Sequence, residues 1–137
     1  WCAERHREAL GRFVRDHVEI LFANEDEAAS LCDSDIASAT ETLCGQVGEA
    51  VITRGENGAF VGSGDIRHEC AAQPFGGVED TTGAGDLFAA GYLFGRTNGR
   101  DPLASGLIAS LAAGEVISHI GARPQADVAA MIAAEKL

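Results

Sequence analysis

The chain carries at residues 80–86 the stretch Asp80-Thr81-Thr82-Gly83-Ala84-Gly85-Asp86, and a helical pattern follows it at once. Its glycines and alanine leave backbone N–H groups uncovered, so a phosphate can approach the positive end of the helix dipole. Asp86 falls in the first helical turn, where the dipole favours the ionised carboxylate that a proton acceptor needs. The stretch therefore predicts an anion hole beside a general base. The competing interpretation is a capped glycine-rich turn with a dipole-complementing aspartate.

Outside this stretch, short apolar runs alternate with helical patterns. Small residues recur at helical spacing after the motif, and Asp101-Pro102 offers an N-cap with proline at the first helical position. Apolar runs between helices are typical of a parallel sheet covered on its faces. The sequence predicts an α/β fold with a largely parallel sheet. The expected strands are 18–23, 50–53, 59–61 and 66–72, and the expected helices are 1–16, 25–31, 36–44, 87–94, 102 to about 121, and 126–136.

The composition limits the classes of partner. The chain has 137 residues, 46% of them hydrophobic, which is enough for one packed domain. Its formal net charge of −11 repels phosphate backbones and anionic lipid, so nucleic acid and membrane surfaces are poor candidates. A nucleotide can still bind an acidic protein, because backbone N–H groups and a metal ion can supply local positive potential.

The cysteines and the beginning of the chain indicate the cellular compartment of the protein and how much of it the chain represents. Cys2, Cys32, Cys44 and Cys70 form no C-x-x-C pair and have no histidine at zinc-ligand spacing, so we expect reduced thiols. No run approaches the roughly 18 apolar residues of a membrane span, and no signal segment opens the chain, which favours the cytoplasm. The chain begins at Trp1 in a helical pattern, which we interpret as a cut through a longer protein.

The motif at residues 80–86, followed by Leu87-Phe88-Ala89-Ala90-Gly91, resembles the C-terminal signature of the ribokinase/PfkB family of small-molecule kinases. The resemblance continues on both sides in the family's order. Asn24-Glu25-Asp26-Glu27 is similar to its Asn-x-x-Glu element, Thr53-Arg54-Gly55-Glu56-Asn57-Gly58 to its nucleotide loop, and Gly121-Ala122-Arg123-Pro124 to the turn after its last long helix. The resemblance implies a ribokinase-like three-layer fold with a mostly parallel central sheet, of which residues 1–137 are the C-terminal ATP-binding and catalytic portion.

The resemblance also implies a set of site residues. Asp86 would accept the proton of the substrate alcohol, while the amides of Gly83, Ala84 and Gly85 hold the transferring phosphoryl group. Asn24 and Glu27 would order Mg²⁺ and the phosphates through water, a role that suits a carboxylate; alternatively, the two residues only cap a helix. The nucleotide loop would contact ATP, or it is an ordinary turn between strands; its residues are Thr53, Arg54, Gly55, Glu56, Asn57 and Gly58.

Three further roles follow from the same resemblance. The Asp80 carboxylate and the Thr82 carbonyl would bind a monovalent cation, potassium in the first instance, unless Asp80 only ties the turn together. Ser110 falls where the family lines the adenine pocket. The histidines at positions 6, 17, 68 and 119 share no local pattern and are interpreted as surface or packing residues.

Other phosphate-binding classes fit poorly. The chain lacks Gly-x-x-x-x-Gly-Lys-Ser/Thr, His-Arg-Asp and Asp-Phe-Gly, which excludes the signatures of P-loop enzymes and protein kinases. The dinucleotide fingerprint would need glycine at position 88, which is Phe88.

Two functional hypotheses follow from the sequence. The first is a kinase that moves the γ-phosphoryl group of ATP to a hydroxymethyl group of a sugar or nucleoside, adenosine being slightly favoured. The second is a non-catalytic nucleotide-binding fragment or regulatory relative. The resemblance places the sugar-binding residues and the lid upstream of Trp1, so the isolated chain is expected to be inactive, and the complete protein could form a homodimer.

Overall fold

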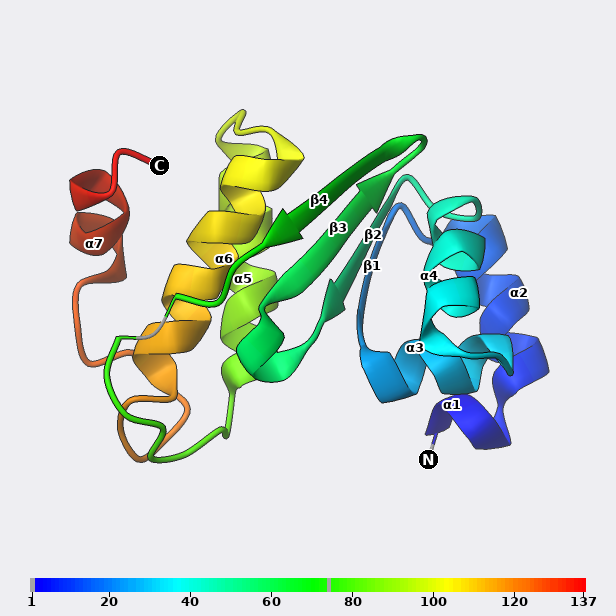
Figure 1. Ribbon diagram of the computed structural model, residues 1–137, viewed down its shortest axis with the longest axis horizontal. Helices are drawn as coiled ribbons and strands as arrows, with labels where there is room; N and C mark the ends of the chain where they lie inside the picture. Colours follow the sequence, from blue (N-terminus) through cyan, green and yellow to red (C-terminus); the bar gives the residue numbers. More distant parts are fainter. Residues whose placement is uncertain (1, 74) are drawn as a thin grey trace. The chain divides into compact units, whose positions relative to one another are not determined.

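The computed structural model describes residues 2–73 and 75–137, and its helices and strands follow one another as an α/β chain (Figure 1). The chain divides into two compact units, each made of two segments. The first unit comprises Trp1–Arg54 and Phe60–His68, and the second comprises Gly55–Ala59 and Glu69–Leu137. The expected α/β class is confirmed.

Four strands form one sheet in the order β1-β2-β3-β4. They are β1 (Ile20–Asn24), β2 (Glu49–Thr53), β3 (Ala59–Ser63) and β4 (Ile66–Cys70). β1 and β2 are parallel, and the Cα of Asn24 is paired with that of Thr53 at their carboxyl ends. Because the carboxyl ends of parallel strands meet at one edge, these two strands deliver Asn24 and Thr53 side by side.

In the first unit, helices cover this parallel pair with an apolar core (Figure 1). They are α1 (Cys2–Arg5), α2 (Arg7–His17), α3 (Glu25–Cys32) and α4 (Ile36–Cys44). α4 begins at Asp35, whose side chain accepts a hydrogen bond from the Ser38 amide. The core contains Val14, Ala28, Ala39, Leu43, Cys44, Val47, Ala50 and Ile52.

In the second unit, α5 (Ala84–Thr97) lies against α6 (Pro102–Val116) (Figure 1). Glycines make the approach possible: a Cβ at Gly91 would lie 2.9 Å from the Cα of Ala109. α6 begins as expected, with the Asp101 carboxylate accepting from the Ala104 amide and proline at its first position. The unit also contains the short helix α7 (Val128–Ala134) and the 3₁₀ turn η1 (Gly55–Asn57).

The boundaries of several elements differ from the expected ones. α5 begins three residues before Leu87, inside the glycine-rich motif. α6 ends at Val116 instead of continuing towards Gly121, since the next carbonyl, that of Ile117, accepts hydrogen bonds from the amides of Glu79 and Asp80. β4 and α7 are shorter than their patterns indicated. The expected helix 1–16 is divided at His6 into α1 and α2. The other differences lie at the ends of elements, where contacts distant in sequence compete with local preference.

Within residues 2–73 and 75–137, the structure shows the state of the cysteines and the length of every helix. All four cysteines are free; Cys44 and Cys70 are buried, Cys32 is half-buried and Cys2 is exposed. Within the same residues, no group of three or more histidine, cysteine or acidic side chains could hold a metal ion. No helix described by the structure has the length and apolarity needed to cross a bilayer.

Candidate active site

The glycine-rich motif forms a tight turn that opens α5. Gly83 is the N-cap residue, with φ of +83°, a left-handed conformation that glycine adopts without steric cost. Packing imposes a second requirement, because a Cβ at position 83 would lie 2.7 Å from the Cβ of Ala122. The turn is therefore built from two segments about 40 residues apart, and glycine is needed at position 83 for both reasons.

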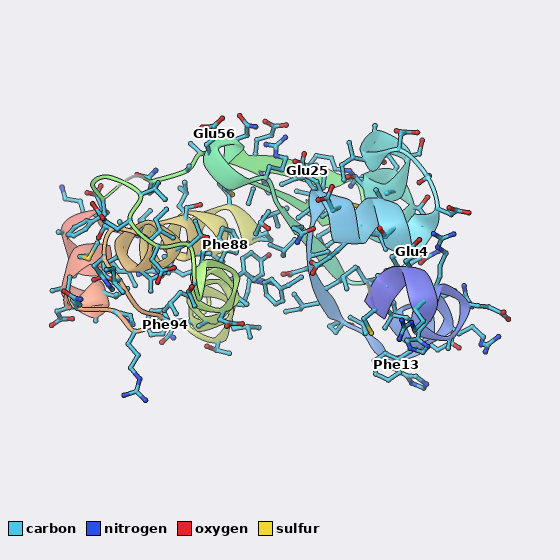
Figure 2. All side chains as sticks on the ribbon, turned by 90° about the horizontal axis from the view of Figure 1, so that it is seen from below. Glu4, Phe13, Glu25, Glu56, Phe88 and Phe94 are labelled. Carbon is cyan, nitrogen blue, oxygen red and sulfur yellow. The ribbon has the colours of Figure 1, made fainter. Side chains whose placement is uncertain are left out.

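The beginning of α5 has the character of an anion site. Among the described residues, no side chain caps this helix. The Ala84 amide donates to the Thr81 carbonyl at 3.2 Å, and the other N–H groups of the first turn lie at the positive end of the dipole. A Cβ at Gly85 would meet nothing within 4 Å. Asp86 lies in the first turn with its side chain exposed, and Phe88, two residues further (labelled in Figure 2), is buried. The arrangement places helix N-terminal amides without a side-chain cap and an exposed carboxylate in one helical turn.

Asp80 joins this turn to the segment after α6. Its Oδ1 accepts a hydrogen bond from the Thr82 amide at 2.9 Å, and its Oδ2 accepts one from the Gly121 amide at 3.0 Å. Hydrogen bonds from the Thr82 hydroxyl and amide and from Gly121 lower the pKa of Asp80 to about 2. The carboxylate is therefore negatively charged at neutral pH. Its chemistry fits a monovalent cation, and its hydrogen bonds fit the alternative role of tying the turn together.

No local pattern assigns a role to Glu115, which holds the segment after Gly121. Its side chain is 1% exposed, and its Oε1 accepts hydrogen bonds from the amides of Gln125 at 2.8 Å and Ala126 at 2.7 Å. His119 Nε2 lies 3.3 Å from the same oxygen. Burial raises the pKa of Glu115, but these amides and His119 outweigh it and leave the pKa below its ordinary value. One signal was available: Glu115 is the only charged residue in α6.

In the first unit, Asn24 and Glu27 form a reciprocal capping box at the start of α3. Asn24 Oδ1 accepts from the Glu27 amide at 2.8 Å, and Glu27 Oε2 accepts from the Asn24 amide at 2.9 Å. The capping role is therefore present, and it leaves Glu27 Oε1 available on an exposed side chain. Glu25, in the same first turn (Figure 2), and Asp26 add negative charge. Exposed carboxylates fit water-mediated contact with Mg²⁺ better than direct ligation.

The predicted nucleotide loop follows β2. Thr53 is the last residue of β2 and, like Arg54, is half-buried. Gly55, Glu56 and Asn57 form the exposed turn η1, in which Glu56 is labelled in Figure 2. Gly58 has φ of +82°, and a Cβ there would collide with the carbonyl oxygen of Cys70.

Ser110 lies in the buried face of α6. It is 4% exposed, and its Oγ has no hydrogen-bond partner among the described residues. Thr82, in contrast, is exposed in the glycine-rich turn. Two groups of predicted residues form, one within each unit: Asn24, Glu27 and Thr53 around the ends of β1 and β2, and residues 80–86 at the start of α5. The predicted nucleotide loop is divided between the units, since residues 55–58, like Ser110, belong to the second.

Comparison with known proteins identifies the family of the chain. The family model described as pfkB family carbohydrate kinase matches residues 2–129. The chain belongs to this family. The pfkB assignment covers every candidate site residue, and it confirms the family resemblance drawn from the motif at residues 80–86.

Individual pfkB relatives are kinases of nucleosides and sugars. The cytidine kinase of Thermococcus kodakarensis is 42% identical over 98 residues, which are 69% of this chain and 35% of that protein. The adenosine kinase of Sinorhizobium meliloti has a solved structure that matches with a TM-score of 0.92 and 39% identity, over 99% of this chain and 42% of that one. A probable sugar kinase of Rhizobium etli gives a TM-score of 0.94 and 38% identity, over 98% and 42%.

These matches confirm the ribokinase-like fold for the portion present. The chain spans less than half the length of these relatives.

Proposed function

We propose that the protein containing this chain is an ATP-dependent kinase that transfers the γ-phosphoryl group to a hydroxymethyl group of a sugar or nucleoside. The observation that carries the proposal is the start of α5, where an uncapped helix end, an open position at Gly85 and an exposed Asp86 occur in one turn. Phosphoryl transfer depends mainly on positioning and on charge stabilisation, both of which a turn of backbone amides supplies.

Asp86 is assigned the role of general base. Its exposed carboxylate can accept the proton of the acceptor hydroxyl as that oxygen attacks the γ-phosphorus. The amides of Gly83, Ala84 and Gly85 are assigned the role of stabilising the negative charge on the transferring phosphoryl group, because the positive end of the helix dipole lies there. Base and anion hole are then fixed by the same backbone turn.

The remaining candidate residues are assigned to the binding of the nucleotide and of metal ions. Thr53 to Gly58 and Asn24 would contact the nucleotide, and Ser110 would lie behind the adenine. Mg²⁺ would neutralise phosphate charge, with Glu27 acting through water from its exposed first turn. The Asp80 carboxylate, with the Thr82 carbonyl, is the proposed monovalent-cation site.

Nucleosides are the substrate class that we propose first, with adenosine ahead of ribose and fructose. The support is the combination of a cytidine kinase and an adenosine kinase among the relatives with about 40% identity.

The decisive test is Asp86→Asn in the full-length protein, assayed by ADP release with adenosine, cytidine, ribose and fructose. Loss of the proton acceptor is expected to lower kcat by about 10²- to 10⁴-fold while ATP affinity remains nearly unchanged. Glu8→Gln is the matched control, because Glu8 is also an exposed acid in the first turn of a helix and should leave kcat unchanged.

Two results would contradict the proposal. An Asp86→Asn variant with most of its kcat would remove Asp86 from the general-base role. A folded wild-type protein that binds ATP without acceptor-dependent ADP release would favour the non-catalytic alternative.

A further inference from the structure

Glu115 is in an unfavourable place for a carboxylate. It is the next-to-last residue of α6, where the negative end of the helix dipole opposes an acidic side chain. It is also 1% exposed, and its Oε2 has no hydrogen-bond partner among the described residues. Buried polar groups left without a partner are rare enough in proteins to need an explanation.

What Glu115 holds is a segment with no helix or strand of its own. Residues 117–127 connect α6 to α7. Among the side chains that the structure describes, only that of Glu115 binds their backbone at two points, through the Gln125 and Ala126 amides. Charged acceptors form stronger hydrogen bonds than neutral ones. The carboxylate thereby fixes the far end of this connection against the end of α6.

The near part of the same connection contacts the glycine-rich turn and the residue before it at three positions. The Ile117 carbonyl accepts from the Glu79 amide at 2.8 Å, and the Gly121 amide donates to Asp80 Oδ2 at 3.0 Å. Ala122 then occupies the space beside Gly83, where a Cβ would come within 2.7 Å of its own. A displacement of residues 121–126 must therefore move the support of the anion hole.

We propose that Glu115 is a positioning residue for phosphoryl transfer, which acts by clamping residues 121–126 so that Gly121 and Ala122 hold the turn at Asp80 and Gly83 in place. The inference rests on the proposed kinase function and adds a residue about 30 positions from the motif to its machinery. Glu115 does not touch the reacting atoms; it determines where the amides of Gly83, Ala84 and Gly85 lie.

The kinetic test compares Glu115→Ala with Glu115→Gln in the full-length protein. Glu115→Ala is expected to lower kcat per folded molecule by about 10- to 100-fold, the effect of a small misplacement of catalytic groups, with little change in the KM of the acceptor. Glu115→Gln keeps an oxygen acceptor of the same reach and is expected to recover most of that loss. Ile108→Ala is the control, because Ile108 is fully buried in the same helix and its truncation loosens packing without removing a hydrogen bond to the connection.

A second measurement does not depend on activity. Hydrogen exchange of backbone amides should accelerate at Gln125, Ala126 and Gly121 in Glu115→Ala, and should stay near wild-type rates there in Ile108→Ala. A purely structural role predicts equal losses of thermal stability and unchanged kcat per folded molecule in both variants, which would overturn the inference. Unchanged exchange at Gly121 would also overturn it. If the wild-type protein phosphorylates no acceptor, the kinase proposal fails. Whether Glu115 holds residues 121–126 in place is then decided by hydrogen exchange at Gly121, Gln125 and Ala126 alone.

Discussion

Gly83 and Gly85 are two residues apart in one turn, yet the structure gives them different reasons to be glycine. Gly83 has a left-handed φ and is packed against Ala122, so a side chain there disturbs the fold as well as any bound phosphate. A Gly83→Val variant therefore cannot separate the two effects. A side chain at Gly85 would enter open space, so its effect on phosphate placement can be measured separately.

Gly85→Ala is expected to lower activity without lowering stability. The free energy of unfolding should stay equal or rise by up to about 1 kcal/mol, since alanine is favoured over glycine in a helix. The kcat/KM for ATP should fall by about tenfold or more, because a methyl group would occupy space near the amides that the phosphate approaches. Thermal unfolding and steady-state kinetics measure both quantities. Gly11→Ala, in open space on α2, should gain stability without losing activity.

Asp80 permits a test of the cation proposal at the same scale. Potassium is expected to raise kcat in the full-length protein by fixing the turn around Asp80, and sodium should substitute poorly. Asp80→Asn should remove the difference between the two ions. Equal wild-type rates in potassium, sodium and tetramethylammonium buffers would leave Asp80 only its hydrogen bonds to Thr82 and Gly121.

At the scale of helices and strands, the order and type of most elements could be predicted, because apolar runs and caps are local signals. Asp101-Pro102 marked the beginning of α6 correctly. Its end was predicted wrongly, since the Ile117 carbonyl bonds to residues almost 40 positions earlier. The site divides in the same way. Residues 80–86 were recognisable as one continuous motif, whereas the clamp at Glu115 depends on contacts that no local pattern encodes.

The cap of α4 predicts a pH dependence of stability. Hydrogen bonds from the Ser38 amide and hydroxyl lower the pKa of Asp35. A pKa lower in the folded than in the unfolded state means that the stabilisation is complete above the unfolded value of about 3.9 and disappears as pH falls through the folded value. Urea unfolding should therefore show Asp35→Ala less stable than wild type at pH 7, with the difference shrinking below about pH 4. Asp35→Ser keeps a neutral cap, so its stability relative to Asp35→Ala should not vary with pH in this way.

At the scale of the whole molecule, the comparison with longer relatives predicts how residues 1–137 behave alone. These residues match only 35–42% of the length of the cytidine, adenosine and sugar kinases. Positioning of the acceptor can account for about 7–11 kcal/mol of barrier lowering, and the groups that supply it are expected outside this chain. Purified residues 1–137 should release no ADP in response to adenosine, cytidine or ribose. Robust acceptor-dependent turnover would show that this chain contains a complete site.

The division of the chain into two units has a consequence for how such a protein can be recombined. Each unit is assembled from two separate stretches, and the chain passes from one unit to the other after Arg54, after Ala59 and after His68. A single crossover between two homologous genes therefore cannot exchange one unit without leaving the other with mixed parentage. Every chimera made with one junction in residues 54–69 inherits at least one unit with mixed parentage. Replacement of one whole unit without any part of the other requires three junctions, all within about fifteen codons.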